Sequence, residues 1–184
     1  RFAPAAAKAD VWLPIRPGTD VALQLAWIRY IIGHQLFDKD FVLKWTNLPY
    51  LVNTKTKMTV RADEVFNNGS KEDFVVWDAK TNQPQPLPYP WNEALDPVLD
   101  GEFNYNGVNY KTGFRLLKER AEPWTLEKAG ETCWLKPEKI EEAIKIYADG
   151  PGGLSLGVAT DQNPNSVQAA MGAVILNALM GYVE

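Results

Sequence analysis

Apolar side chains recur at helical spacing along several stretches of the chain. After the turn at residues 16–20 they return every three or four positions as far as Leu36, which predicts a helix capped by Thr19 or Asp20. The same spacing follows Pro137 and Ser166 and predicts two further helices. Shorter helices are predicted at residues 38–45, at residues 114–120 and directly after Thr125.

Two short apolar runs are predicted to be strands, at residues 11–15 and 154–158. Each is followed by a polar turn or loop and then by a helix, and this alternation is typical of a layered α/β domain. Ligands of such domains bind at the carboxyl ends of parallel strands. The loops to examine for function are therefore residues 16–20 and 160–165.

The middle of the chain has a different composition. Residues 47–111 contain nine Asn, and five Pro lie between positions 83 and 97. The Asn106-Gly107 pair favours a type I′ hairpin turn. Short β-type runs lie at residues 58–60 and 74–77. We therefore predict a β-rich insertion, residues 47–111, in a partial layered α/β domain formed by residues 1–46 and 112–184.

Composition and charge exclude several classes of protein. The 184 residues are 46% apolar, which is enough for a folded core and excludes disorder as the main state. A net charge of −4 gives no electrostatic footprint for nucleic acid or for an anionic membrane surface. One Cys and one His cannot build a disulfide framework, a zinc site or an iron–sulfur site from this chain alone. The longest apolar stretch, residues 167–183, is too short and too interrupted for a membrane span.

Candidate chemistry is concentrated in the turn at residues 16–20. Gly18 lets a ligand approach the backbone, and the helix that follows offers N–H groups at its N-terminus. The Asp20 carboxylate can accept two hydrogen bonds, which suits the N1–H and N2–H edge of guanine. The alternative is a plain turn with a helix cap, which is common for these residue types.

The remaining chemically versatile residues are interpreted as structural. His34 lies on a predicted helix among apolar neighbours, and Cys133 has no neighbouring His or basic cluster that would activate its thiol. No nucleophile, base and orienting group can be assembled from the chain, which argues against an autonomous hydrolase.

A series of motifs runs through the chain in a fixed order. The first, residues 1–20, begins at Arg1 and ends in Pro17-Gly18-Thr19-Asp20. Others lie at residues 31–32, 36–42, 45–46, 124–129, 137–140, 147–148, 156–158 and 177–181. In this order they resemble the molybdopterin oxidoreductases of the dimethyl sulfoxide reductase family, in which an Asp-x-Arg strand end leads into a Pro-Gly-Thr-Asp turn. The insertion is similar to the variant found in members like acetylene hydratase and pyrogallol transhydroxylase.

The resemblance implies a large enzyme with a bis(molybdopterin guanine dinucleotide) cofactor that carries Mo or W. It implies a Rossmann-like domain that binds one guanosine arm: Arg1 matches the Arg of Asp-x-Arg, while Gly18, Thr19 and Asp20 match the turn that contacts guanosine. Asp20 would pair with the guanine edge. A 4Fe-4S cluster would lie in a part of the parent enzyme outside this segment. The implied partners are the remainder of the parent chain and, beyond it, iron–sulfur electron-transfer and membrane-anchor subunits.

From the resemblance we also expect the chain to be an internal segment of such an enzyme, because the Asp of the Asp-x-Arg motif would precede Arg1. Alone it is expected to have no redox activity and little affinity for the cofactor, because both cofactor arms and the metal need surfaces that it lacks. This hypothesis predicts Gly18 and Asp20 at the carboxyl end of a parallel sheet, with Arg1 beside them. Two alternatives stay open: a stand-alone nucleotide-binding module without chemistry, and an interaction domain whose insertion is the contact surface. By analogy with the family, the parent enzyme would be found in the bacterial periplasm or cell envelope, or in the cytoplasm. The sequence favours none of these compartments.

Overall fold

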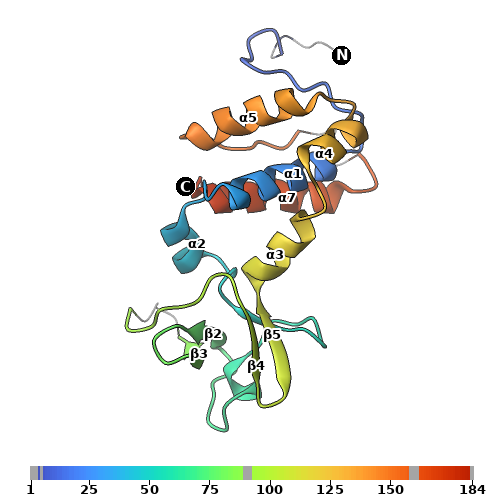
Figure 1. Ribbon diagram of the computed structural model, residues 1–184. Helices are drawn as coiled ribbons and strands as arrows, with labels where there is room; N and C mark the ends of the chain where they lie inside the picture. The colour runs from blue at the N-terminus through green and yellow to red at the C-terminus, as the bar shows by residue number, and fades with distance from the viewer. Residues whose placement is uncertain (1–3, 5, 89–92, 158–161, 183–184) are drawn as a thin grey trace. The chain divides into compact units, whose positions relative to one another are not determined.

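The computed structural model of the chain describes residues 4, 6–88, 93–157 and 162–182. The chain forms two compact units: a helical unit, residues 1–38 with 120–184, and a strand-rich unit, residues 39–119. Figure 1 shows helices in the first and the labelled strands in the second. The mixture of helices and β-sheets agrees with the predicted α/β class.

Within the described residues, the helical unit contains four helices that begin where the sequence predicts them. They are α1 (Asp20–Gly33), α4 (Leu126–Cys133), α5 (Pro137–Asp149) and α7 (Ser166–Met180). Thr125 caps α4, since its hydroxyl accepts a hydrogen bond from the N–H of Lys128. Pro137 occupies the first turn of α5, where its missing N–H costs nothing.

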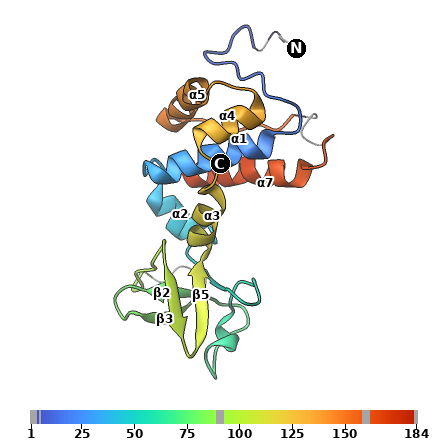
Figure 2. The same ribbon diagram turned by 45° about the vertical axis from the view of Figure 1, so that its right-hand side comes forward.

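The core of the helical unit lies between α1 and α7, which run side by side in Figures 1 and 2. Both helices bury alanines, Ala22 and Ala26 in α1 and Ala169 and Ala173 in α7, and small side chains allow a close approach of two helices. Larger apolar side chains from three helices complete the core: Ile28, Ile31, Ile140, Ile144, Leu176 and Leu179.

In the part of the strand-rich unit that the structure describes, the strands form two antiparallel sheets. One has the order β1 (Leu51–Asn53), β5 (Val108–Thr112), β4 (Glu102–Tyr105), and the other pairs β2 (Phe74–Asp78) with β3 (Gln83–Leu87). The elements α2 (Lys39–Trp45), η1 (Ala62–Glu64) and α3 (Gly113–Ala121) accompany them. The predicted hairpin turn is confirmed, because Asn106 and Gly107 both have positive φ, at 50° and 78°, between β4 and β5.

Strand β3 was not predicted, because it contains two prolines. Its register against β2 pairs Pro84 with Trp77 and Pro86 with Val75. Proline cannot donate to a ladder, but the alternation with Gln83 and Gln85 places both prolines at positions that need no donor. A strand at the edge of a two-stranded sheet tolerates this arrangement.

The two predicted strands at residues 11–15 and 154–158 are not found in the described residues. The N–H of Ile15 donates to the carbonyl of Leu13 at 2.8 Å, which bends the first segment. In the second, the backbone N–H and C=O of Leu154 are bonded to the side chain of Asn177. Because neither segment has a strand neighbour in the described part of the chain, the parallel sheet expected beside Gly18 and Asp20 is absent there.

The strand-rich unit is expected to lose stability in acid, and the reason is the carboxylate of Asp78 at the end of β2. Its buried carboxylate accepts hydrogen bonds from the N–H of Asp96 at 2.7 Å and from Thr81. Burial alone would raise the pKa of Asp78, but these hydrogen bonds to the charged form outweigh it and lower the pKa.

A lowered pKa means that Asp78 adds stability above about pH 4, the ordinary Asp value, and that this stability is lost as the pH falls through the folded-state pKa. Urea unfolding followed between neutral and acid pH should show this loss. In Asp78→Asn the acid slope should flatten, with lower stability at neutral pH. An unchanged slope in that variant would contradict the assignment.

Candidate functional site

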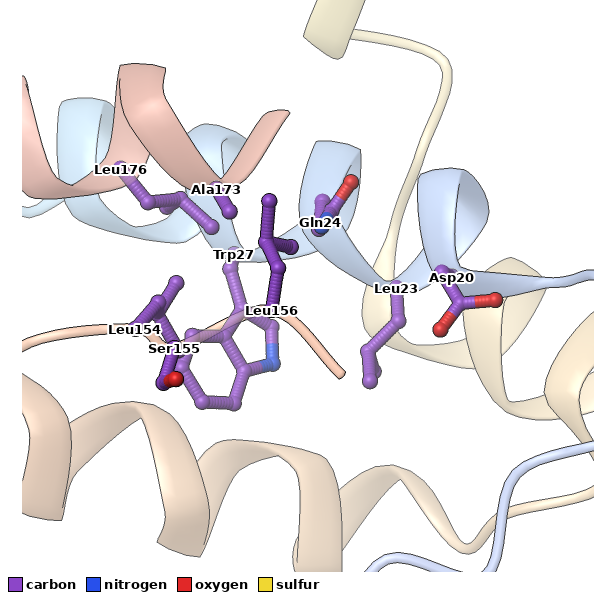
Figure 3. A pocket seen from close by; sticks show the side chains of 9 residues that line it. All are labelled: Asp20, Leu23, Gln24, Trp27, Leu154, Ser155, Leu156, Ala173 and Leu176. Carbon is purple, nitrogen blue, oxygen red and sulfur yellow. The ribbon is translucent and has the colours of Figure 1, made fainter. Parts of the chain in front are cut away.

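A cavity of about 160 Å³ lies in the helical unit against one face of α1. Figure 3 shows its lining, which comes from α1, from α7 and from the extended segment at residues 154–156. The lining residues are Asp20, Leu23, Gln24, Trp27, Leu154, Ser155, Leu156, Ala173 and Leu176. Most of them are apolar, and the single carboxylate, that of Asp20, lies at one end of the α1 row.

The turn before α1 presents an approachable backbone. Gly18 has a φ of 80°, and a Cβ built at this position would meet no atom within 4 Å. Thr19 occupies the N-cap position, but its hydroxyl donates to the carbonyl of Arg16 at 2.6 Å instead of capping the helix. The first N–H groups of α1 therefore have no side-chain cap, which leaves a helix N-terminus suited to an anionic group.

The segment opposite α1 is fixed in place by Asn177 of α7. Its Oδ1 accepts hydrogen bonds from the N–H of Leu154 at 2.8 Å and from the hydroxyl of Tyr147 at 3.0 Å. Its Nδ2 donates to the carbonyl of Leu154 at 3.3 Å. The hydroxyl of Tyr182 in turn donates to the carbonyl of Tyr147, and burial raises the pKa of Tyr147, which keeps it a neutral donor.

Two polar atoms of the lining have no hydrogen-bond partner among the described residues. They are Nε1 of Trp27 and Oε1 of Gln24, and both are shielded from solvent. Gln24 is anchored at its other end, since Nε2 donates to the carbonyl of Ala169, and its Oε1 packs against Gly172. A buried polar atom without a partner is costly, so the unpaired state of these two atoms calls for an explanation.

The structure brings together three of the four predicted site residues. Gly18, Thr19 and Asp20 lie in one turn, and Asp20 lines the cavity. Arg1 lies outside the described residues, as do Thr160 and Asp161 of the second predicted loop. The described part of that loop, residues 162–165, does not line the cavity.

Of the two residues interpreted as structural, one is packed as expected and the other is in different surroundings than expected. Cys133 is buried, which confirms a packed thiol, and burial raises the pKa of that thiol. His34 is exposed at the end of α1 instead of lying among apolar neighbours, and its ring stacks on Tyr30.

Sequence reasoning missed the other polar residues of the site. Gln24 and Trp27 follow Asp20 at i+4 and i+7, so helical periodicity places all three on one face of α1. That spacing was the available signal for them. Asn177 was visible as the one polar residue between Gly172 and Gly181 in an otherwise apolar helix.

The described residues offer neither a metal site nor a membrane helix. No group of three or more His, Cys, Asp or Glu side chains in them could hold a metal ion. In the same residues no helix has the length and hydropathy to cross a bilayer.

Several known proteins are similar to this chain. A protein of Halobacterium salinarum, named as the catalytic subunit of a dimethyl sulfoxide reductase, is 33% identical over 150 residues, 81% of this chain and 18% of that protein. A sulfite dehydrogenase subunit of Allochromatium vinosum is 37% identical over 146 residues, 73% of this chain and 14% of that protein. Acetylene hydratase from Pelobacter acetylenicus matches the whole chain in structure, with a TM-score of 0.60 and 26% identity, over 16% of its own length. No family model matches the chain.

By these similarities the chain corresponds to a segment of larger enzyme subunits. It belongs to the dimethyl sulfoxide reductase family, whose members depend on a molybdenum or tungsten pterin cofactor. The family resemblance noted in the motifs is confirmed. The chain spans about a fifth of the length of the curated relatives it matches, so the activity of the whole protein is taken up as a proposal.

Proposed function

We propose that this chain binds one guanosine arm of a bis(molybdopterin guanine dinucleotide) cofactor in a longer oxidoreductase. The observation that carries the proposal is the Asp20 carboxylate at the edge of an apolar cavity. Guanine is the base that presents two adjacent N–H donors, N1–H and N2–H, to such an acceptor. The walls are mostly apolar, and a base seated against them would shield these hydrogen bonds from water, which strengthens them.

The turn before α1 suits the phosphates of the same arm. Gly18 leaves its backbone open to approach, and the uncapped N-terminus of α1 attracts negative charge. Thr19 holds this turn closed through Arg16, and Arg1 would add a cation beside it by its match to the family motif. The residues present therefore fit the guanosine part of the cofactor.

The other parts of the cofactor machinery do not fit the described residues. They provide no donor set for Mo, W or a 4Fe-4S cluster, so we place these groups on the remainder of the parent chain. When bound there, the metal would supply oxygen-atom, hydride or hydration chemistry. Several relatives are named as alpha or catalytic subunits, which supports electron-transfer and membrane-anchor subunits as partners of the parent.

The names of the relatives support a cofactor role over a substrate role for this segment. One is named for dimethyl sulfoxide, one for sulfite and one for acetylene, yet all three share the segment. A region that recognised the substrate would be expected to differ among them, whereas cofactor binding is a task they have in common.

The proposal is tested on the full-length parent enzyme. After denaturation in acid, the guanine nucleotide released is measured against the molybdenum or tungsten present. Two guanine nucleotides per metal are expected from the bis form of the cofactor. A metal-loaded enzyme that releases none would contradict the proposal.

A further inference from the structure

We propose that Trp27 recognises the guanine base together with Asp20. Its indole N–H would donate a hydrogen bond to the edge of the base that carries O6 and N7. The inference rests on the proposed guanosine site and adds a residue that determines its specificity. It starts from the buried Nε1 of Trp27, which has no hydrogen-bond partner in the described part of the chain.

The position of Trp27 suits this role. It lies two turns after Asp20 on the same face of α1, and helical side chains lean toward the N-terminus, so its ring extends back toward Asp20. Figure 3 shows the indole nitrogen on the edge of the ring that faces Leu23 and Asp20. The ring itself is held by Tyr147, with ring centroids 5.4 Å apart.

The size and polarity of the cavity select the ligand. An apolar cavity of about 150 Å³ accepts a benzene ring, so about 160 Å³ with one open side suits a single planar base. The lining offers an anionic acceptor, Asp20, an unpartnered neutral acceptor, Oε1 of Gln24, and one unpartnered donor, Nε1 of Trp27. Guanine has the complementary pattern, donors at N1 and N2 and acceptors at O6 and N7, whereas adenine has no N1–H donor for Asp20.

The test is a titration of the 184-residue chain with guanosine monophosphate, followed by NMR of the indole N–H groups. The seven Trp side chains give separate signals, and Trp27→Phe identifies the one of interest. We expect this signal to move downfield on binding, and Trp27→Phe to weaken binding about fivefold, the effect of one neutral hydrogen bond. Trp45→Phe, at an exposed Trp of the strand-rich unit, is the matched control and should bind like the wild type.

Inosine monophosphate separates this inference from the proposed function. It keeps O6 and N7 but lacks the 2-amino group, so Trp27→Phe should weaken its binding to the same degree. If guanosine monophosphate binds and Asp20→Asn weakens it, while the Trp27 signal stays fixed and Trp27→Phe binds normally, the role of Trp27 is overturned and the guanosine site stands. Absence of any binding up to millimolar nucleotide would overturn both.

Discussion

Asp20→Asn is expected to weaken the binding of guanosine monophosphate to the chain about 30-fold. The carboxylate accepts two hydrogen bonds from guanine, and each is strengthened by its charge. Asn offers one acceptor and turns an NH₂ donor toward a second donor of the base. Losing a hydrogen bond to a charged group costs about 1.5–3 kcal/mol, and about 2 kcal/mol corresponds to the expected factor.

The same substitution should lower the guanine nucleotide content of the full-length enzyme. Asp40→Asn is the matched control, because Asp40 is also an acidic residue in the first turn of a helix, α2, and does not line the cavity. Both variants lose a favourable interaction with a helix dipole, so any difference in nucleotide binding between them is due to the contact of Asp20 with the guanine base. Equal binding by the two variants would contradict the role of Asp20.

The binding of inosine monophosphate gives a sharper form of this prediction. Without the 2-amino group, only the N1–H remains to donate to Asp20. The wild-type chain should therefore prefer guanosine monophosphate to inosine monophosphate, and Asp20→Asn should reduce that preference. If Asp20→Asn keeps the full preference for guanosine monophosphate over inosine monophosphate, the 2-amino group does not donate to Asp20.

The parts of the fold that could be predicted depend on local signals. Helix α5 begins at Pro137 because proline suits a first turn, and the β4–β5 hairpin follows from the Asn106-Gly107 pair. The predicted strands at residues 11–15 and 154–158 failed because a strand exists only where a neighbour continues its ladder. Local composition cannot show that Asn177 takes both backbone groups of Leu154.

The candidate site divides in the same way. Gly18, Thr19 and Asp20 could be proposed because a turn and a helix start lie within a few residues of each other. The opposite wall is more than 130 residues away in sequence, at Leu154, and only the packing of α7 on α1 brings it to Trp27. Without an account of that packing, the unpartnered indole nitrogen could not be recognised.

Asn177→Leu is expected to lower the free energy of unfolding of the helical unit by about 3 kcal/mol. Leu has a similar size but leaves three groups without a partner: the N–H and C=O of Leu154 and the hydroxyl of Tyr147. Each shielded polar group left unpaired costs about 1–3 kcal/mol, and partial access to water reduces the sum. Urea unfolding measures the loss, and hydrogen exchange at the Leu154 amide should become fast.

Two further variants identify which hydrogen bonds matter. Gln168→Leu makes the same chemical change at an exposed position of α7 and should alter stability by less than about 0.5 kcal/mol. Tyr147→Phe removes only the hydroxyl and should cost about 1 kcal/mol, with the Leu154 amide still protected. Because Leu154 is a wall of the cavity, Asn177→Leu should also weaken the binding of guanosine monophosphate, whereas Gln168→Leu should not. If Asn177→Leu matches Gln168→Leu in stability and exchange, Asn177 does not fix this wall, and the shape of the cavity must depend on the packing of α1 against α7 alone.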